Sequence, residues 1–292
     1  PHGVSSLATY MAAEPRDGRY QHLKPVWDFW PAPDLSHVEP GSKNPLPGVT
    51  AGTMVDVWAD HVPGSPAYMG WGKIRFPAHL DRQLTVATAF QAYRVVSGHL
   101  TVTSGGETTF WSAANFGKRY QGQTIAPLQP VTLGPGAQLV VPPQTEVRLK
   151  TGTTPVRIIA VVSFRVRPGP DAHQSWLTGP TPQADPFKGI RRELVAGGLG
   201  ATFPTGQTHV LLQYGVAQPG ARYPRHIHFG PELIYDEYGT ITVFASPEMV
   251  ITSAQGQIEE GKYDTPTPLG PKGMALVQGF GIHRAVNYGK VP

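Results

Sequence analysis

Cysteine is absent from the 292-residue sequence, and charged residues make up only 15% of it. Without cysteine there can be no disulfide bond and no zinc–thiolate site, so any bound metal must have nitrogen and oxygen ligands. The 24 basic and 20 acidic side chains give a net charge of +4, and no stretch of the sequence concentrates the basic ones. Because nucleic-acid binding needs a clustered basic patch, we expect no nucleic-acid partner.

Long hydrophobic runs are also missing. No segment approaches the roughly 20 apolar residues of a membrane span, and no secretory signal peptide is visible, so we expect no membrane association. The lack of cysteine leaves the cellular compartment open. The location therefore stays unknown: the cytoplasm is favoured, and export remains an alternative if a signal before Pro1 was removed. Helical patterns are scarce as well, with residues 81–90 and 190–197 the only candidate helices.

The abundant features are those of β-structure. Apolar residues reach 40%, with 34 glycines and 31 prolines, which favours many short strands joined by tight turns. Runs rich in β-branched and aromatic residues predict strands. They cover residues 53–60, 93–102, 137–143, 156–166, 208–216, 239–245 and 274–280. The predicted fold class is all-β.

The sequence divides into four parts. Residues 1–50 form an irregular arm in which Trp27, Phe29 and Trp30 stand among prolines, which excludes a long helix. Residues 51–168 are predicted to form a first β-barrel, and residues 188–292 a second. Residues 169–187 contain four prolines and few aliphatic side chains, and we interpret them as a linker.

An internal repeat indicates that the two predicted barrels arose by duplication. Residues 91–102 match residues 232–243 at an offset of 141, which pairs Gln91 with Glu232. Residues 77–81 match residues 224–228, which pairs His79 with His226 and Asp81 with His228. A third block, at an offset of 137, pairs Gly136, Gln144 and Glu146 with Gly273, Gly281 and His283.

Four potential metal ligands occur in the second half. His226 and His228 are two residues apart, so on a strand both point to the same face. Glu232 follows after a short turn, and His283 comes about fifty residues later, after a glycine-rich turn. Three imidazoles and one carboxylate suit Fe(II), Mn(II), Ni(II), Cu(II) or Zn(II). Such a ligand set leaves positions open for water or substrate, as catalytic metal sites do.

These residues resemble the cupin family. Gly220, His226, His228, Glu232 and Gly239 reproduce the first cupin motif, G-x5-H-x-H-x3-E-x6-G, without a mismatch. Gly273, Gly281, His283 and Asn287 fit the second motif more loosely. Gly279 replaces its proline, and the histidine comes one residue early. The resemblance implies two cupin double-stranded β-helix (jelly-roll) barrels in tandem, with one divalent transition metal in the second.

The first half departs from the motif. At the positions aligned with the four ligands it offers His79, Asp81, Gln91 and Glu146, and a neutral glutamine there removes charge from the site. Asp81 and Gln91 are also ten residues apart, whereas His228 and Glu232 are four apart. We therefore expect a degenerate first barrel without metal.

Strand alternation suggests which side chains surround the metal. If Glu232 points inward, Asp236 and Tyr238 share its face. A carboxylate in an apolar barrel has a raised pKa, so Asp236 is a candidate general acid or base, unless a bulge turns it outward. Arg222 and Tyr223 precede the ligands and are candidate substrate-binding residues with Tyr238.

The second barrel has little sequence after Asn287, where a cupin barrel normally has at least one more strand. An unpaired sheet edge invites pairing. We therefore expect another segment, the N-terminal arm of the same or a partner subunit, to complete the sheet.

Bicupins with one intact site resemble quercetinase-like dioxygenases. The first functional hypothesis is thus a metal-dependent oxygenase acting on a small organic substrate, aromatic or enolisable. The alternatives are a metal-dependent decarboxylase or isomerase of a keto or sugar acid, and a non-catalytic small-molecule-binding protein. The sequence does not choose the metal. We expect a homodimer.

Overall fold

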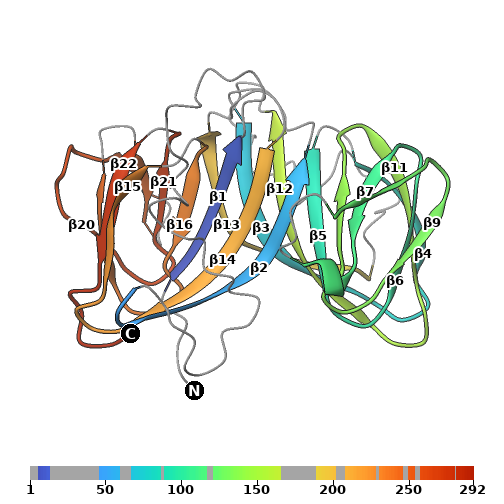
Figure 1. The fold of residues 1–292 in the computed structure, drawn as a ribbon, viewed down its shortest axis with the longest axis horizontal. Helices are drawn as coiled ribbons and strands as arrows, with labels where there is room; N and C mark the ends of the chain where they lie inside the picture. Colours follow the sequence, from blue (N-terminus) through green and yellow to red (C-terminus); the bar gives the residue numbers. More distant parts are fainter. Residues whose placement is uncertain are drawn as a thin grey trace. The chain divides into compact units, whose positions relative to one another are not determined.

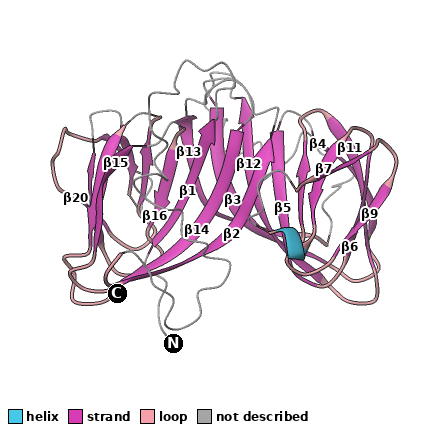
Figure 2. Cartoon of the chain, viewed as in Figure 1, coloured by secondary structure: helices cyan, strands magenta, loops and turns pink. Residues whose placement is uncertain are grey.

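The structure is a computed structural model. It describes residues 6–13, 46–59, 67–86, 89–116, 121–165, 189–201, 208–227, 230–245, 249–253, 257–279 and 281–292. Within these ranges nearly all regular structure is antiparallel β-strand, and the single helix is the short 3₁₀ turn η2 (Ala113–Asn115) (Figure 2). The predicted all-β class is confirmed. None of the described helical segments is long and apolar enough to cross a membrane. The predicted linker, 169–187, lies outside the described residues.

The protein consists of two compact units. The first unit is Val57–Gly200, and the second combines Pro1–Asp56 with Ala201–Pro292. These boundaries differ from the expected ones at three places. Residues 191–200, expected in the second barrel, belong to the first unit. Residues 51–56, expected in the first barrel, and the N-terminal strand belong to the second unit. All three differences arise because the strands concerned pair with distant segments.

The first unit contains a seven-stranded and a four-stranded sheet. The larger has the order β13-β3-β12-β5-β10-β7-β8 and the smaller β4-β11-β6-β9. Their bounds are β3 (Ala67–Phe76), β4 (Asp81–Val86), β5 (Ala89–Ser97), β6 (Leu100–Ser104), β7 (Thr108–Trp111), β8 (Gln123–Ile125), β9 (Pro130–Leu133), β10 (Gln138–Val141), β11 (Thr145–Thr151), β12 (Val156–Arg165) and β13 (Arg191–Ala201).

Both candidate helices are wrong. Residues 81–86 form β4, residues 89–90 begin β5, and residues 191–197 lie in β13. In these segments strand pairing outweighs the weak helical preference of the local sequence, because β4 pairs along its whole length with β11.

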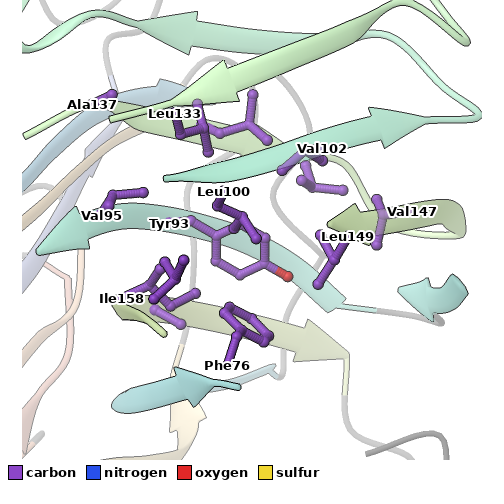
Figure 3. Packing of buried hydrophobic residues seen from close by; sticks show 14 of the residues in the cluster. Phe76, Tyr93, Val95, Leu100, Val102, Leu133, Ala137, Val147, Leu149 and Ile158 are labelled. Atoms are coloured by element: carbon purple, nitrogen blue, oxygen red, sulfur yellow. The ribbon is translucent and has the colours of Figure 1, made fainter. Parts of the chain in front are cut away.

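The core of the first unit lies between its two sheets. Tyr93 and Val95 of β5 and Ile158 of β12 pack there against Val102 and Leu149 of the smaller sheet (Figure 3). All five are no more than 5% exposed. Alternate residues of these strands point into this cluster, as expected for paired sheets that bury one face.

The second unit has the same pair of sheets. Its seven-stranded sheet has the order β19-β18-β21-β16-β1-β14-β2, and its four-stranded sheet β15-β22-β17-β20. Their bounds are β1 (Ser6–Ala13), β2 (Val49–Ala59), β14 (Thr208–Ala217), β15 (Arg222–Ile227), β16 (Glu232–Tyr235), β17 (Ile241–Ala245), β18 (Met249–Thr252), β19 (Ile258–Glu260), β20 (Thr267–Leu269), β21 (Met274–Val277) and β22 (Ile282–Val286). The shared strand order supports the duplication.

Strand β1 occupies a central place in the larger sheet of the second unit. It lies between β14 and β16 and pairs antiparallel with both, with Thr9 opposite Leu212 on one side and Leu233 on the other (Figure 1). In the first unit the corresponding place, between β3 and β5, belongs to β12, which directly follows β11. The expectation that the N-terminal arm completes the second sheet is confirmed for residues 6–13.

Candidate metal centre

Three of the four predicted ligands come together at one end of the second unit. His226 on β15 lies directly opposite His283 on β22. Paired residues of an antiparallel ladder point their side chains to the same face. Glu232 is the first residue of β16, in the other sheet, and its side chain faces the two imidazoles. The cluster therefore bridges the two sheets.

The geometry of the cluster is compact. One potential ligand atom from each of His226, Glu232 and His283 lies within 4.8 Å of the others. The two imidazole ring centroids are 4.1 Å apart, with a 60° angle between the ring planes. His283 Nε2 is 2.5 Å from Glu232 Oε2. Glu232 and His283 are 6% and 2% exposed, and His226 is half-buried, so the open side of the cluster is at His226.

Backbone carbonyls orient both imidazoles. His226 Nδ1 lies 2.7 Å from the carbonyl oxygen of Pro224, and His283 Nδ1 lies 3.0 Å from that of Gly281. A carbonyl oxygen only accepts, so each Nδ1 carries the proton and donates it. In the neutral imidazole this leaves Nε2 with the lone pair, whereas protonated His283 carries a proton on Nε2, next to Glu232 Oε2. Metal-binding histidines typically donate their second ring nitrogen to a carbonyl or carboxylate in this manner.

Electrostatics at the cluster favour positive charge. Burial alone lowers the pKa of His283, but the adjacent Glu232 carboxylate and the Gly281 carbonyl outweigh it and raise the pKa above its ordinary value. The carboxylate thus stabilises a cation at this position. A metal ion placed among the three side chains would supply that charge in place of the imidazole proton.

The donor set fits a divalent transition metal. Two imidazole nitrogens and one carboxylate oxygen suit these ions, and hard cations such as magnesium prefer oxygen alone. His228, the fourth predicted ligand, lies outside the described residues. No other group of three or more potential ligands occurs in the part of the chain that the structure describes.

The first unit has no equivalent centre among its described residues. The predicted counterparts His79, Asp81 and Glu146 are all exposed. Asp81 binds Arg148 in an ion pair of 2.7 Å on the outer face, and Gln83 Nε2 donates to Glu146 at 2.9 Å. These three side chains do not converge, so the proposed alignment of the four positions was wrong.

Strand pairing identifies the true counterparts. Ala245 lies opposite His283, and its repeat partner Ser104 lies opposite Val147. Val147 in turn lies opposite Leu84, just as His283 lies opposite His226. Leu84 and Val147 therefore occupy the two histidine positions. Val147 belongs to the hydrophobic core, and the partly buried Leu84 packs against it. The sequence alignment was off by one residue at Glu146, and a one-residue slip moves a side chain to the opposite face.

Gln91 is the counterpart of Glu232, as predicted. It is half-buried at the start of β5 and lies opposite Val141, as Glu232 lies opposite Val277. The hydroxyl of Tyr93 donates to Gln91 Oε1. The first unit thus replaces the ligands with two aliphatic side chains and a neutral amide.

Asp236 is buried but lies away from the ligands. It follows the end of β16, four residues from Glu232, a distance of roughly 13 Å along a strand. Its Oδ2 accepts the backbone N–H of Ile241 at 3.0 Å. Burial raises its pKa from 3.8 to about 7, although hydrogen bonds from the Ile241 and Tyr238 backbones lower it. This geometry favours a role in the β16–β17 turn, and its catalytic role stays a prediction.

The three predicted substrate-binding residues lie at that same distal end. Arg222 is exposed at the start of β15, opposite Val286 and four residues from His226. Tyr223 packs against the apolar clusters of the unit. Tyr238 is 49% exposed, in the turn after Asp236. The structure does not bring these side chains together with the histidines.

A histidine–aspartate pair went unnoticed in the sequence. His209 Nε2 on β14 lies 2.7 Å from Asp56 Oδ1 on β2, with side-chain exposures of 13% and 21%. Leu211 on β14 and Glu232 on β16 both lie opposite Tyr10 of β1, so their side chains point to the same face of the sheet. His209 is two residues from Leu211 in an uninterrupted register, so it shares the face that carries Glu232. Asp56 and His209 are 153 positions apart in the sequence, so no local pattern indicates the pair.

No protein-family model matches the sequence, and the search of curated proteins gives no match. Among solved structures, the chain is similar to RmlC from Streptococcus suis in complex with dTDP-D-xylose, at 12% identity and TM-score 0.22. The match covers 32% of this chain and 43% of that one, less than half its length.

Two further solved structures match over more of the chain. The formate complex of oxalate decarboxylase from Lactobacillus farciminis has 12% identity over 83% of both chains, with TM-score 0.38. A cupin 2 conserved barrel domain protein from Leptotrichia buccalis has 9% identity over 80% of this chain and 88% of that one, with TM-score 0.26. Similarity at these values carries no inference about activity.

Proposed function

We propose that this protein is a bicupin metalloenzyme. In this proposal one divalent transition metal is bound in the second unit by His226, His228, Glu232 and His283, and a small organic substrate reacts there. The observation that carries the proposal is the convergence of two imidazole nitrogens and one carboxylate oxygen within 4.8 Å. His226 and Glu232 have the spacing of the first cupin motif, and His283 comes from the second. His228 is included in this ligand set only because of its position in the cupin motif.

The first reaction we propose is oxygenation of a phenolic or enolisable substrate. A bound iron or copper ion would supply Lewis acidity and one-electron redox chemistry. The protein's own contribution is to hold the ligands. The carbonyls of Pro224 and Gly281 fix the orientation of the two imidazoles, and the burial of Glu232 and His283 limits access of water from the core side.

A specific observation favours a second candidate, oxygen-independent decarboxylation or isomerisation of a keto or sugar acid. These reactions need a proton delivered or removed beside the substrate. The His209–Asp56 pair lies on the same sheet face as Glu232, and a histidine held by a carboxylate is a common proton-transfer arrangement. Asp236, by contrast, accepts a backbone hydrogen bond in the turn at the end of β16 away from Glu232.

The metal site is tested by elemental analysis of purified protein. We expect about one transition metal per chain, and at least a tenfold lower content in His226→Ala and Glu232→Gln. Glu146→Gln, which removes an exposed carboxylate in the first unit, is the matched control and should keep its metal. Equal metal content in all four proteins, or none after reconstitution, would overturn the proposal.

The reaction class is tested with the metal-loaded protein and two probes, catechol and a 2-keto acid. Oxygen uptake with catechol that stops in Glu232→Gln supports the oxygenase. Conversion of the keto acid at an unchanged rate under argon supports the second candidate. Saturable binding of either probe with no turnover in air or argon would replace the enzyme with a binding protein.

A further inference from the structure

A large groove occurs in the first unit, far in sequence from the metal ligands. It has a volume of about 840 Å³, within the range of small-molecule sites. It is lined by parts of four neighbouring strands, β13, β3, β12 and β5, and by Ile190, which precedes β13. All of these segments belong to the first unit. The metal centre plays no part in it.

The groove is strongly basic. Its charged lining residues are Lys73, Arg75, Arg157, Arg191 and Arg192, against Glu193 as the one acid. Lys73, Arg75, Arg157 and Arg191 are exposed. No local pattern in the sequence predicts this cluster, because the lining residues are spread between positions 73 and 193 and are brought together by the sheet.

Two arginines lie directly opposite each other in this sheet. Arg75 of β3 is the cross-strand partner of Arg157 of β12, and Lys73 lies two pairs further along, on the same face. Like charges at directly opposed positions are destabilising. Among the described residues, no carboxylate forms an ion pair with Arg75 or Arg157. The fold therefore carries a repulsive pair that an anion would relieve.

Strand alternation places these charges on the face opposite the core. Ile158 belongs to the core cluster and Ile74 packs against it, so Arg75, Arg157 and Ile159 point the other way. Apolar groups accompany the charges, because Ile159 and the 51% exposed Val96 also line the groove. Guanidinium groups bind phosphate and carboxylate in bidentate fashion.

We propose that this groove binds a small organic polyanion, with its phosphate or carboxylate groups on Arg75 and Arg157 and its apolar part against Val96 and Ile159. The size of the groove favours a small molecule over a polymer. Its charge requires at least two negative groups, because one would leave most of the lining uncompensated. This site is independent of the proposed metal chemistry.

The proposal is tested by isothermal titration calorimetry of the full chain with pyrophosphate and with citrate, at 150 mM salt. The two probes separate phosphate from carboxylate recognition. We expect saturable binding of at least one, weakened tenfold or more in the double variant Arg75→Gln/Arg157→Gln. The matched control is Arg148→Gln/Lys150→Gln, which removes the same charge from the Asp81 ion pairs and should bind within twofold of wild type.

Thermal unfolding shows whether Arg75 and Arg157 serve ligand binding or stabilise the fold. Without anion, Arg75→Gln/Arg157→Gln should unfold at the same temperature as wild type or higher, because the repulsion is removed. The probe should raise the midpoint of wild type only. The proposal would be overturned if the double variant bound the probes as tightly as wild type, or if neither probe bound saturably. It would also be overturned if the protein bound only nucleic acid or acidic polypeptide, or if the ligand-free double variant were less stable than wild type.

Discussion

Individual side chains at the metal centre depend on backbone groups for their chemistry. His226 and His283 donate Nδ1–H to carbonyls only two residues before them, so the local strand conformation alone determines which nitrogen can bind a metal. Loss of such a hydrogen bond to the second ring nitrogen of a metal-binding histidine commonly lowers metal affinity by ten- to a hundredfold. Asp236 shows the opposite case, in which a buried carboxylate near the site in sequence is used for a turn.

Asp236 should make stability depend on pH. Its pKa rises from 3.8 to about 7 on folding, so between these values the folded state binds more protons than the unfolded state. The resulting stabilisation is complete below about pH 4 and is lost as the pH rises through 7. Relative to Asp236→Asn, the wild type should lose on the order of 2 to 4 kcal/mol between pH 4 and 8.

Urea unfolding of the two proteins across this range measures the difference. Glu237→Gln, an exposed neighbour, is the control and should follow the wild type. Parallel pH profiles of wild type and Asp236→Asn would show that Asp236 ionises normally in the folded protein.

His209 should act in turnover and leave metal binding intact. If the His209–Asp56 pair moves a proton, His209→Gln and Asp56→Asn should each lower kcat about 100-fold or more at unchanged metal content. The measurement is steady-state kinetics against pH together with elemental analysis, with His99→Gln, an exposed histidine of the first unit, as control. The proton-transfer role would be excluded if kcat did not fall in these variants, or if it fell only in proportion to their loss of metal.

At the level of strands, β1 has the largest consequence for the site. Its residues Tyr10 and Thr9 pair with Glu232 and Leu233 of β16, so β1 supports the strand that carries the proposed carboxylate ligand. Without it, β14 and β16 would each have an unpaired edge in the middle of the sheet. Such edges expose backbone donors and acceptors and favour misassociation.

Thr9→Pro tests this arrangement. Proline lacks the N–H that a central strand uses in its ladder, so the variant should lose about 3 kcal/mol or more of unfolding free energy. It should also bind metal more weakly, because Glu232 loses its neighbour. Thr9→Val keeps the N–H and the β-branched shape and is the control. Unchanged denaturant midpoints in Thr9→Pro would show that β1 does not pair there in solution.

For the whole molecule, duplication followed by specialisation explains the difference between the two units. Both keep the same two sheets, but the first fills the ligand positions with Leu84 and Val147 and gains core packing. The second keeps a buried histidine–carboxylate cluster at the cost of desolvation. We further propose a homodimer, which analytical ultracentrifugation would test.

Metal should stabilise the folded protein through the second unit alone. At a free concentration 100 times its Kd, a ligand of the folded state contributes about 2.7 kcal/mol, equivalent to a rise in Tm of roughly 5 to 10 °C. Differential scanning calorimetry before and after chelation should show this shift in wild type and not in His226→Ala. An equal shift in both would place the metal elsewhere.

The sequence by itself determined the fold class, the duplication and three ligands that the structure brings together. These follow from local signals: alternating β-branched residues, turn glycines such as Gly98 and Gly239, whose φ angles of 82° and 90° favour glycine, and the fixed spacing of His226 to Glu232.

Only the tertiary structure decided the counterparts in the first unit, the place of β1 and β13, the His209–Asp56 pair and the basic groove. Each depends on which strands pair and in which register, and register reverses the face of a side chain with every residue. Pairing between segments more than a hundred residues apart is set by burial and backbone hydrogen bonding over a whole sheet, so no local pattern in the sequence encodes it.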